Sequence, residues 1–236
     1  MQKLGLIGGI GPESTIVYYR LIIKRFQEKF QTKEYPEILI NSINNTEMLS
    51  YVFNNELDKL VDFLSKKIET LVLAGVDFAA IASNTPHIVF DKLTERIKIP
   101  LISIVTETCK EISNKKLHCI GLLGTKSTMS NGFYETAANN FGIQIITPNA
   151  EDQNYIHEKY MTELLFNNIK ETTKKQLIQI VRKLQEKDSI QGLILGGTEL
   201  PLILSQDDFN DIVLFDTLKI HTEAIVERMI VKKNYL

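Results

Sequence analysis

The amino-acid sequence predicts an α/β protein made of two pseudo-symmetric domains, each built on a parallel sheet. Two observations lead to this prediction. Short apolar runs alternate along the chain with longer segments of helical periodicity, which is typical of right-handed βαβ units. A glycine-bounded apolar run also occurs twice, at residues 4–8 and 120–124, and each copy precedes Ser/Thr residues and a helical segment.

The expected strands are short and mostly apolar at every position, as strands covered on both faces of a sheet are. They are Leu4–Ile7, Ile38–Ile43, Phe78–Ala82, Leu101–Ser103, Cys119–Leu123, Gln144–Ile146, Gly192–Leu195 and Ile212–Phe215. The expected helices carry apolar residues at a spacing of three to four. They are Ser14–Phe30, Glu56–Ala74, Val105–Asn114, Asn131–Phe141, Ile156–Asn168, Thr172–Glu186 and Thr217–Val231.

A second internal match supports two homologous halves. Residues 79–85 resemble residues 193–199, and this match sets Ser83 opposite Gly197. Similar offsets for two strand-loop motifs indicate a duplicated unit. We expect residues 1–100 plus 207–236 to form the first domain and residues 101–206 to form the second. Because ligands of such folds bind where the carboxyl ends of strands gather, we expect the site in a cleft between the domains.

The amino-acid composition argues against several classes of protein. The 236 residues are 44% hydrophobic and 24% charged, with a net charge of −2, which is ordinary globular composition. This balance argues against nucleic-acid or membrane-surface partners. No apolar stretch reaches the roughly 18–20 residues of a membrane-spanning helix, and we expect a cytoplasmic protein.

The cysteines and histidines show no pattern of a metal centre or of disulfide bonds. Cys109 and Cys119 are the only cysteines, which excludes a disulfide framework. The two cysteines and four histidines lack the spacing of metal ligands, so we expect no metal site.

A glycine-rich loop, Gly8-Gly9-Ile10-Gly11-Pro12, follows the first expected strand. Backbone N–H groups at such a helix N-terminus favour an anion, so we expect Gly9 to contact a small carboxylate. A dinucleotide site fits poorly, because a third glycine is missing and Pro12 lacks an N–H group. The remaining alternative is a tight βα turn with proline early in the helix.

Polar loops follow three other expected strands at equivalent positions. Hydroxyl and amide groups gathered at strand ends predict a site for a small polar ligand, although helix capping explains the same residue types. The expected binding residues are Asn84, Thr85, Thr125, Ser127, Thr128 and Thr198.

These motifs resemble the aspartate/glutamate racemase family over essentially the whole chain. The resemblance rests on 5–15, 84–87, 121–125, 197–201 and 215–217, with His221 in the last helix. It implies two α/β domains, a small amino-acid or dicarboxylate substrate, racemisation without a cofactor, and a homodimer.

The resemblance also implies a mechanism in which two cysteine thiols face opposite sides of the substrate α-carbon. The positions of those cysteines hold Ser83 and Gly197 here, so the two-thiol mechanism is not carried over. His87, four residues after Ser83, and Glu199, two residues after Gly197, are the candidate substitutes. Their alternatives are a satisfied core histidine and a carboxylate near a helix N-terminus.

Three hypotheses follow for the function. The first is an amino-acid racemase that uses groups other than cysteine. The second is an inactive or repurposed relative that binds a small amino or dicarboxylic acid. The third is an enzyme that acts on another small carboxylate. We expect the paired substitution of Ser83 and Gly197 by cysteine to create or raise racemase activity.

Overall fold

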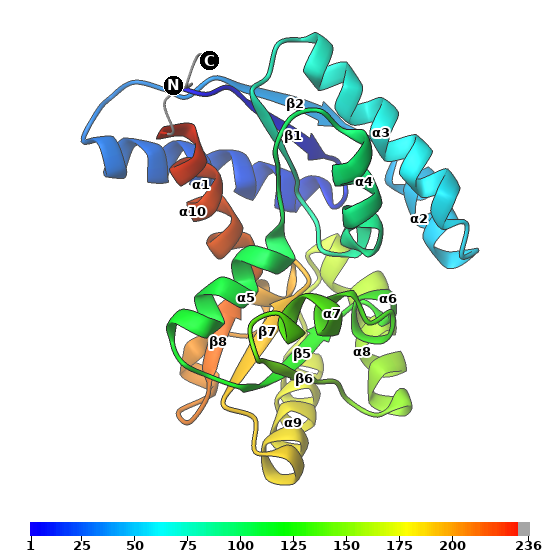
Figure 1. The fold of residues 1–236 in the computed structure, drawn as a ribbon. Coiled ribbons are helices and arrows are strands. Elements are labelled where there is room, and N and C mark those ends of the chain that lie inside the picture. Colours follow the sequence, from blue (N-terminus) through cyan, green and yellow to red (C-terminus); the bar gives the residue numbers. More distant parts are fainter. Residues whose placement is uncertain (231–236) are drawn as a thin grey trace. The chain divides into compact units, whose positions relative to one another are not determined.

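The computed structural model of the chain describes residues 1–230, in which strands and helices alternate (Figure 1). The strands are β1 (Leu4–Gly8), β2 (Ile38–Ser42), β3 (Phe78–Ile81), β4 (Leu101–Ile102), β5 (Cys119–Gly124), β6 (Gln144–Ile146), β7 (Gly192–Gly196) and β8 (Val213–Asp216). The α-helices are α1 (Pro12–Phe30), α2 (Asn45–Phe53), α3 (Leu57–Leu73), α4 (Phe90–Arg96), α5 (Ile104–Asn114), α6 (Lys126–Ser130), α7 (Phe133–Asn139), α8 (Ala150–Thr162), α9 (Glu171–Asp188) and α10 (Thr217–Ile230). Short 3-10 turns lie at Thr85–Val89, Leu164–Phe166, Leu200–Leu202 and Gln206–Asp208.

The strands form two parallel sheets with equivalent topology. One sheet has the order β2-β1-β3-β4 and the other has the order β6-β5-β7-β8. In each sheet the first strand in the chain lies between the second and the third, as β1 does between β2 and β3. The predicted fold class, two pseudo-symmetric parallel-sheet α/β domains, is confirmed.

The chain divides into two compact units. Within the described residues, unit 1 contains Met1–Ile104 and Leu218–Ile230, and unit 2 contains Val105–Thr217. The sequence placed these boundaries at 100/101 and 206/207. The second boundary lies later in the structure because β8 pairs with β7, with Leu214 beside Leu193, and so belongs to the second sheet.

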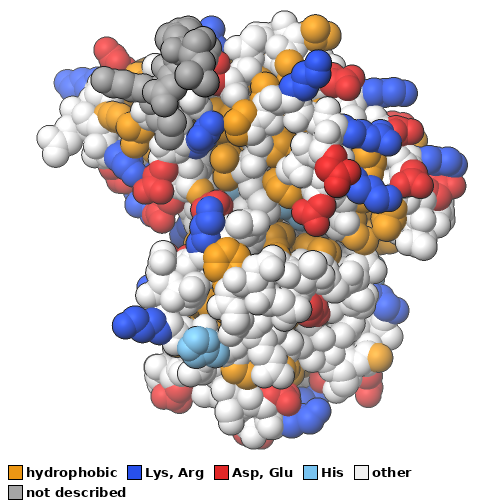
Figure 2. All heavy atoms as spheres, in the orientation of Figure 1, with side chains coloured by type: hydrophobic (Ala, Val, Ile, Leu, Met, Phe, Trp, Pro, Cys, Tyr) orange, Lys and Arg blue, Asp and Glu red, His pale blue; other side chains and the backbone are white. Residues whose placement is uncertain are grey.

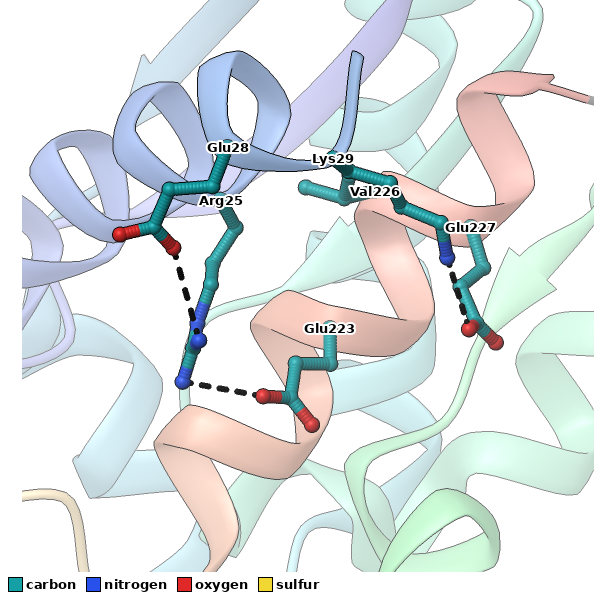
Figure 3. Close-up of a pocket in the computed structure, with 6 residues that line it drawn as sticks. All are labelled: Arg25, Glu28, Lys29, Glu223, Val226 and Glu227. Carbon is teal, nitrogen blue, oxygen red and sulfur yellow. Dashed lines mark hydrogen bonds and ion pairs between the residues drawn. The ribbon is translucent and has the colours of Figure 1, made fainter. Parts of the chain in front are cut away.

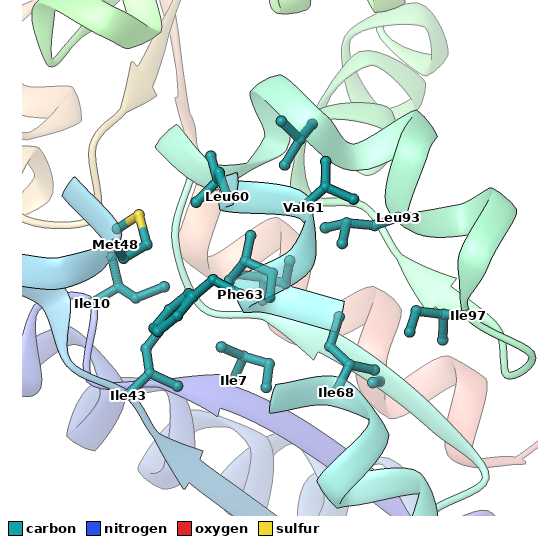
Figure 4. Packing of buried hydrophobic residues seen from close by; sticks show 14 of the residues in the cluster. Ile7, Ile10, Ile43, Met48, Leu60, Val61, Phe63, Ile68, Leu93 and Ile97 are labelled. Carbon is teal, nitrogen blue, oxygen red and sulfur yellow. The ribbon is translucent and has the colours of Figure 1, made fainter. Parts of the chain in front are cut away.

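Unit 1 buries both faces of its sheet, which explains the continuous apolar runs of its strands. Successive strand residues point to opposite faces. Ile7 and Ile81 belong to a core cluster with side chains of α2, α3 and α4 (Figure 4). Leu6 and Ala80 belong to a different cluster, formed with α1 and α10.

Helix α10 closes unit 1 by packing beside α1. In the interior, His221 Nδ1 accepts a hydrogen bond from the Tyr18 hydroxyl at 2.9 Å. Towards the surface, Arg25 pairs with Glu223 at 3.0 Å and Lys29 pairs with Glu227 at 2.9 Å (Figure 3). The last helix thereby returns to the first half of the chain, as the sequence predicts.

Unit 2 is held together by α8 and α9 against its sheet. Leu123 and Leu193 of the sheet pack with Ile156 and Tyr160 of α8 and with Leu177 of α9. Helix α8 begins at Ala150, six residues before the sequence-predicted start at 156. The Asn149 side chain accepts a hydrogen bond from the Asp152 amide at 3.0 Å, which explains the earlier start.

Helix α2 is an element that the sequence patterns did not indicate. Its N-cap is Asn44, whose side chain accepts hydrogen bonds from the amides of Thr46 and Glu47 at 3.1 and 3.3 Å. We expect Asn44→Ala to lower the free energy of unfolding by about 1 kcal/mol, because these amides then lose their partner. Urea unfolding checks this prediction. Asn44→Ser, which keeps a capping oxygen, serves as control, and equal losses in both variants would contradict the capping role.

No helix within residues 1–230 is both long enough and apolar enough to cross a bilayer. On the face shown in Figure 2, basic and acidic side chains are interspersed over the helices of unit 1.

Candidate active site

The loop after β1 forms a tight turn that is stabilised by its own helix. Gly9 has a φ of +81°, and a Cβ there would lie 2.7 Å from the Ile43 carbonyl oxygen, so only glycine fits. The Gly9 amide donates to Thr15 Oγ1 at 2.9 Å. This amide therefore serves the turn, as the βα-turn alternative states, and its contact with a carboxylate stays a prediction.

The loop after β3 places three of the expected residues in a buried polar segment. Ser83, Asn84 and Thr85 are all buried, and Thr85 opens the 3-10 turn that contains His87. The His87 amide donates to the Asn84 carbonyl at 2.9 Å. This hydrogen bond places His87 one turn after Asn84, and a catalytic role for Ser83 and His87 stays a prediction.

The His87 side chain belongs to the interior of unit 1. Its Nε2 accepts a hydrogen bond from the Ile104 amide at 3.3 Å, at the start of α5. Its ring stacks on Phe90 with centroids 4.9 Å apart. Burial and the nearby His221 ring lower the pKa of His87 to about 3. A neutral imidazole with this pKa is a very weak base, and a catalytic role for His87 stays a prediction.

His221 is held by hydrogen bonds at both ring nitrogens. In addition to its bond with Tyr18, its Nε2 donates to the Ile102 carbonyl at 3.0 Å. Burial lowers the pKa of His221 to about 4. Both ring nitrogens are therefore engaged, and His221 fixes α10 to α1 and to β4.

In unit 2, the loop after β5 caps a short helix. Thr125 Oγ1 accepts from the Thr128 amide at 3.2 Å, and the two threonine hydroxyls lie 3.1 Å apart. Ser127 Oγ accepts from Asn131 Nδ2 at 2.6 Å. Thr125 therefore caps this helix, as the capping alternative states. Ligand binding by the neighbouring residues stays a prediction.

The loop after β7 contains the most unusual contact of the site. A Cβ built on Gly197 would lie 2.4 Å from Cε2 of Tyr160, and 2.9 Å from both its Cζ atom and its hydroxyl oxygen. Real Cβ atoms essentially never approach another heavy atom this closely. The Tyr160 ring, which comes from α8, therefore occupies the space that a side chain at position 197 would take.

Glu199 lies buried beside this ring. Its carboxylate accepts a hydrogen bond from the Tyr160 hydroxyl and another from Thr198 Oγ1 at 2.9 Å. Burial, together with the charge of Glu199, raises the pKa of Tyr160 well above its usual range. Tyr160, Thr198 and Glu199 thus form one hydrogen-bonded cluster at the end of β7, which we call the Tyr160 cluster.

Comparison with known proteins identifies the family. The Asp/Glu/hydantoin racemase family matches residues 7–225. The chain belongs to this racemase family.

Relatives and solved structures agree with the assignment to the racemase family. The broad specificity amino-acid racemase RacX of Bacillus subtilis (strain 168) is 26% identical over 147 residues, which cover 61% of this chain and 63% of RacX. An aspartate racemase homologue from Pyrococcus horikoshii OT3 has 35% identity and a TM-score of 0.83, covering 97% of this chain and 99% of that one. The Picrophilus torridus aspartate racemase has 19% identity and a TM-score of 0.78, covering 99% and 97%, and so shares the fold.

Neither cysteine of this racemase-family chain lies in a strand-end loop. Cys109 is buried in the middle of α5, and burial raises the pKa of its thiol to about 12. Cys119 is the first residue of β5, at the end of that strand opposite Thr125, and its Sγ donates to the Asp188 carbonyl at 3.3 Å. Both cysteines therefore pack against other side chains of the protein.

Sequence reasoning missed two titratable groups of this racemase-family site, both on α8. One is Tyr160. The other is His157, whose Nδ1 accepts from the Lys126 amide at 3.4 Å. Burial and the charge of Lys126 lower the pKa of His157. Both residues lie on an expected helix, but nothing in their local sequence indicates that they contact the loops after β5 and β7.

Other parts of the described chain offer weaker sites. A surface hollow of about 330 Å³ lies between α1 and α10, but Arg25 and Lys29 there are already paired with acidic side chains (Figure 3). Within residues 1–230, no three His, Cys, Asp or Glu side chains gather as a metal site requires.

Proposed function

We propose that the protein is an isomerase that binds a small amino acid or dicarboxylic acid and transfers a proton at its α-carbon without a cofactor. The observation that supports this most directly is the buried polar chemistry at equivalent strand ends. Ser83, Asn84 and Thr85 follow β3, and Thr198 and Glu199 follow β7, each of them less than 10% exposed. Buried polar groups cost free energy unless they are paired, so a fold retains them mostly for recognition or catalysis.

The loops supply the donors that such a reaction needs. Removal of an α-proton leaves negative charge that spreads into the α-carboxylate of the substrate. Side-chain donors fixed in advance stabilise this charge, and Asn84, Thr85 and Thr128 are the residues we assign to that role. Ser83 contributes a hydrogen bond, because a serine hydroxyl without an activating base is a poor proton acceptor.

The relatives, rather than a single contact, support the choice of candidate substrates. RacX is a broad specificity racemase, and the solved neighbours include an aspartate racemase. We therefore include aspartate, glutamate and a panel of neutral and basic amino acids as candidate substrates. The family resemblance adds a cytoplasmic homodimer to the proposal, which cell fractionation and sedimentation velocity test.

Proton exchange tests the proposal directly. We expect the protein in D₂O to replace the α-proton of at least one amino acid with deuterium, because an isomerase must break that C–H bond. Proton NMR follows the loss of the α-proton signal, and chiral chromatography follows inversion. The same amino acid incubated without protein is the control.

A second candidate function is a binding protein that has lost turnover. The filled space above Gly197 favours this alternative, since no thiol can stand there without movement of Tyr160. Ligand-induced thermal stabilisation without exchange would replace the isomerase by the binding protein. If no amino acid underwent exchange and none stabilised the protein, the isomerase and the binding protein would both be contradicted.

A further inference from the structure

We infer that Tyr160 and Glu199 form an acid–base pair that takes over the role of the missing thiol at position 197. This inference rests on the proposed function, because it assigns the group that moves the α-proton.

Position is the first argument. The Tyr160 hydroxyl oxygen lies 2.9 Å from the point where a Cβ of residue 197 would stand. The side chain that family resemblance places at this position is a thiol, whose sulfur lies one bond beyond the Cβ and carries the proton. The phenol therefore brings a transferable proton into the region where the thiol would carry its own.

The chemical nature of the two side chains, a phenol and a carboxylate, also supports an acid–base role. A phenylalanine would fill the space above Gly197 equally well, yet the chain places a phenol there and directs its proton to a carboxylate. Glu199 is only 3% exposed, and burying a carboxylate costs free energy that packing alone does not return. Two hydroxyl donors, from Tyr160 and Thr198, hold this charge in the interior. Such a buried and strongly coupled pair is typical of functional sites.

Protons and charge are conserved in the transfer step with only the substrate, Tyr160 and Glu199 taking part. The phenol oxygen accepts the substrate α-proton while its own proton passes to the Glu199 carboxylate. The C–H bond breaks, an O–H bond forms at Tyr160, the original phenolic O–H bond breaks, and an O–H bond forms at Glu199. The electron pair of the C–H bond stays on the substrate as a carbanion that its carboxylate stabilises. One negative charge thus moves from Glu199 to the substrate, and reversal returns a proton to carbon.

The charge state of the resting pair suits this relay. Burial and Glu199 keep the pKa of Tyr160 well above its usual range, so the phenol holds its proton at neutral pH. The relay requires a protonated phenol and an ionised Glu199, and at no stage does it require a free phenolate. Thr198 holds the same carboxylate oxygen, Oε2, in place for the transfer.

Tyr160→Phe tests the inference, since it removes the hydroxyl and keeps the ring over Gly197. With the amino acid that the wild-type protein exchanges fastest in D₂O, we expect the exchange rate to fall about 100-fold or more. We expect ligand-induced thermal stabilisation to persist. The control is Tyr155→Phe, a partly buried tyrosine on the same helix outside the Tyr160 cluster, which should exchange at the wild-type rate.

Glu199→Gln provides a second, independent variant. An amide holds the Tyr160 hydroxyl but cannot accept its proton, so we expect a similar loss of exchange. We also expect the acidic limb of the wild-type pH–rate profile, which reports protonation of Glu199, to disappear from any residual activity. A purely structural role for Glu199 would leave the shape of that profile unchanged.

The outcomes separate the two proposals. Wild-type exchange that survives Tyr160→Phe overturns the acid–base pair and leaves the isomerase in place. Loss of exchange together with loss of ligand stabilisation overturns the pair in favour of a binding role for the hydroxyl. A wild-type protein that exchanges no amino acid overturns the isomerase and the acid–base pair together.

Discussion

Gly197→Cys alone is expected to destabilise unit 2 by about 2 kcal/mol or more. The new Cβ would lie 2.4 Å from a ring carbon of Tyr160, which is only 5% exposed and is tied to Glu199 by its hydroxyl. Overpacking of a filled interior costs about 1–3 kcal/mol, because side chains leave their preferred rotamers and the backbone shifts. Breaking the buried hydrogen bond to Glu199 adds about 1–3 kcal/mol when the ring moves aside.

Urea unfolding of a double-mutant cycle measures this clash. Gly197→Ala should cost about as much as Gly197→Cys, since the Cβ makes the closest contact. Tyr160→Ala should be destabilising by itself, at about 3–5 kcal/mol for the loss of a large aromatic side chain. The double variant should cost less than the sum of the single ones, because the cavity accepts the added Cβ. Strict additivity would show that Tyr160 does not occupy this space.

The contact between Gly197 and Tyr160 changes what is expected from introducing cysteines at positions 83 and 197. From the sequence, Ser83→Cys with Gly197→Cys is expected to create or raise racemase activity. With the Tyr160 ring in place, we expect this pair of substitutions to add no racemase activity to that of the wild-type protein, because a thiol at position 197 has no room at the strand end. Replacing Tyr160 by a smaller side chain in the same protein is the additional change that a thiol requires.

Acid is expected to weaken the folded protein strongly between pH 6.5 and pH 4. Burial lowers the pKa of His221 to about 4 and, with the help of His221, that of His87 to about 3. The unfolded chain binds protons at these residues with a pKa near 6.5. Below that pH the unfolded state therefore holds more protons than the native state, and stability falls as the pH falls.

The size of the effect follows from linkage. Each histidine that is protonated only in the unfolded state costs roughly 1.4 kcal/mol per pH unit. The two together give a slope of about 3 kcal/mol per unit between pH 6 and pH 4, with the full stability present above pH 6.5.

Denaturant midpoints across this pH range test the prediction. A His221→Gln variant should lose about half of the slope, although its overall stability is lower because Tyr18 and Ile102 lose part of their hydrogen bonding. His118→Gln is the control, since His118 is exposed and should leave the slope intact. A wild-type midpoint that does not change from pH 6.5 to pH 4.5 would contradict the buried, neutral state of both rings.

The strands could be predicted because a strand that is buried on both faces has apolar residues at consecutive positions. Leu4, Leu6 and Ile7 are all apolar because one face of β1 packs on α1 and α10 and the other on α3. The sequence of helix α2 carries a weaker pattern. Its cap, Asn44, lies two residues after the end of β2, so the change from strand to helix occurs within a few residues.

The loops that follow the strands could be predicted, but the contacts that their residues make with other elements could not. The family resemblance implies a cysteine at position 197, whereas the atoms that fill the space beside Gly197 come from α8. A sequence pattern records spacing along one element and not the contacts between two. The role of His87 was open for the same reason, because its partner, the Ile104 amide, lies 17 residues further along the chain.

The order of the units along the chain has consequences for biosynthesis. Unit 2 is one continuous segment, whereas unit 1 receives its last helix, α10, only after all of unit 2. A nascent chain that ends at residue 217 already contains every strand of the second sheet. It still lacks His221, and with it the hydrogen bonds from α10 to Tyr18 and Ile102. During translation, unit 2 can therefore fold as it emerges, and unit 1 is completed last.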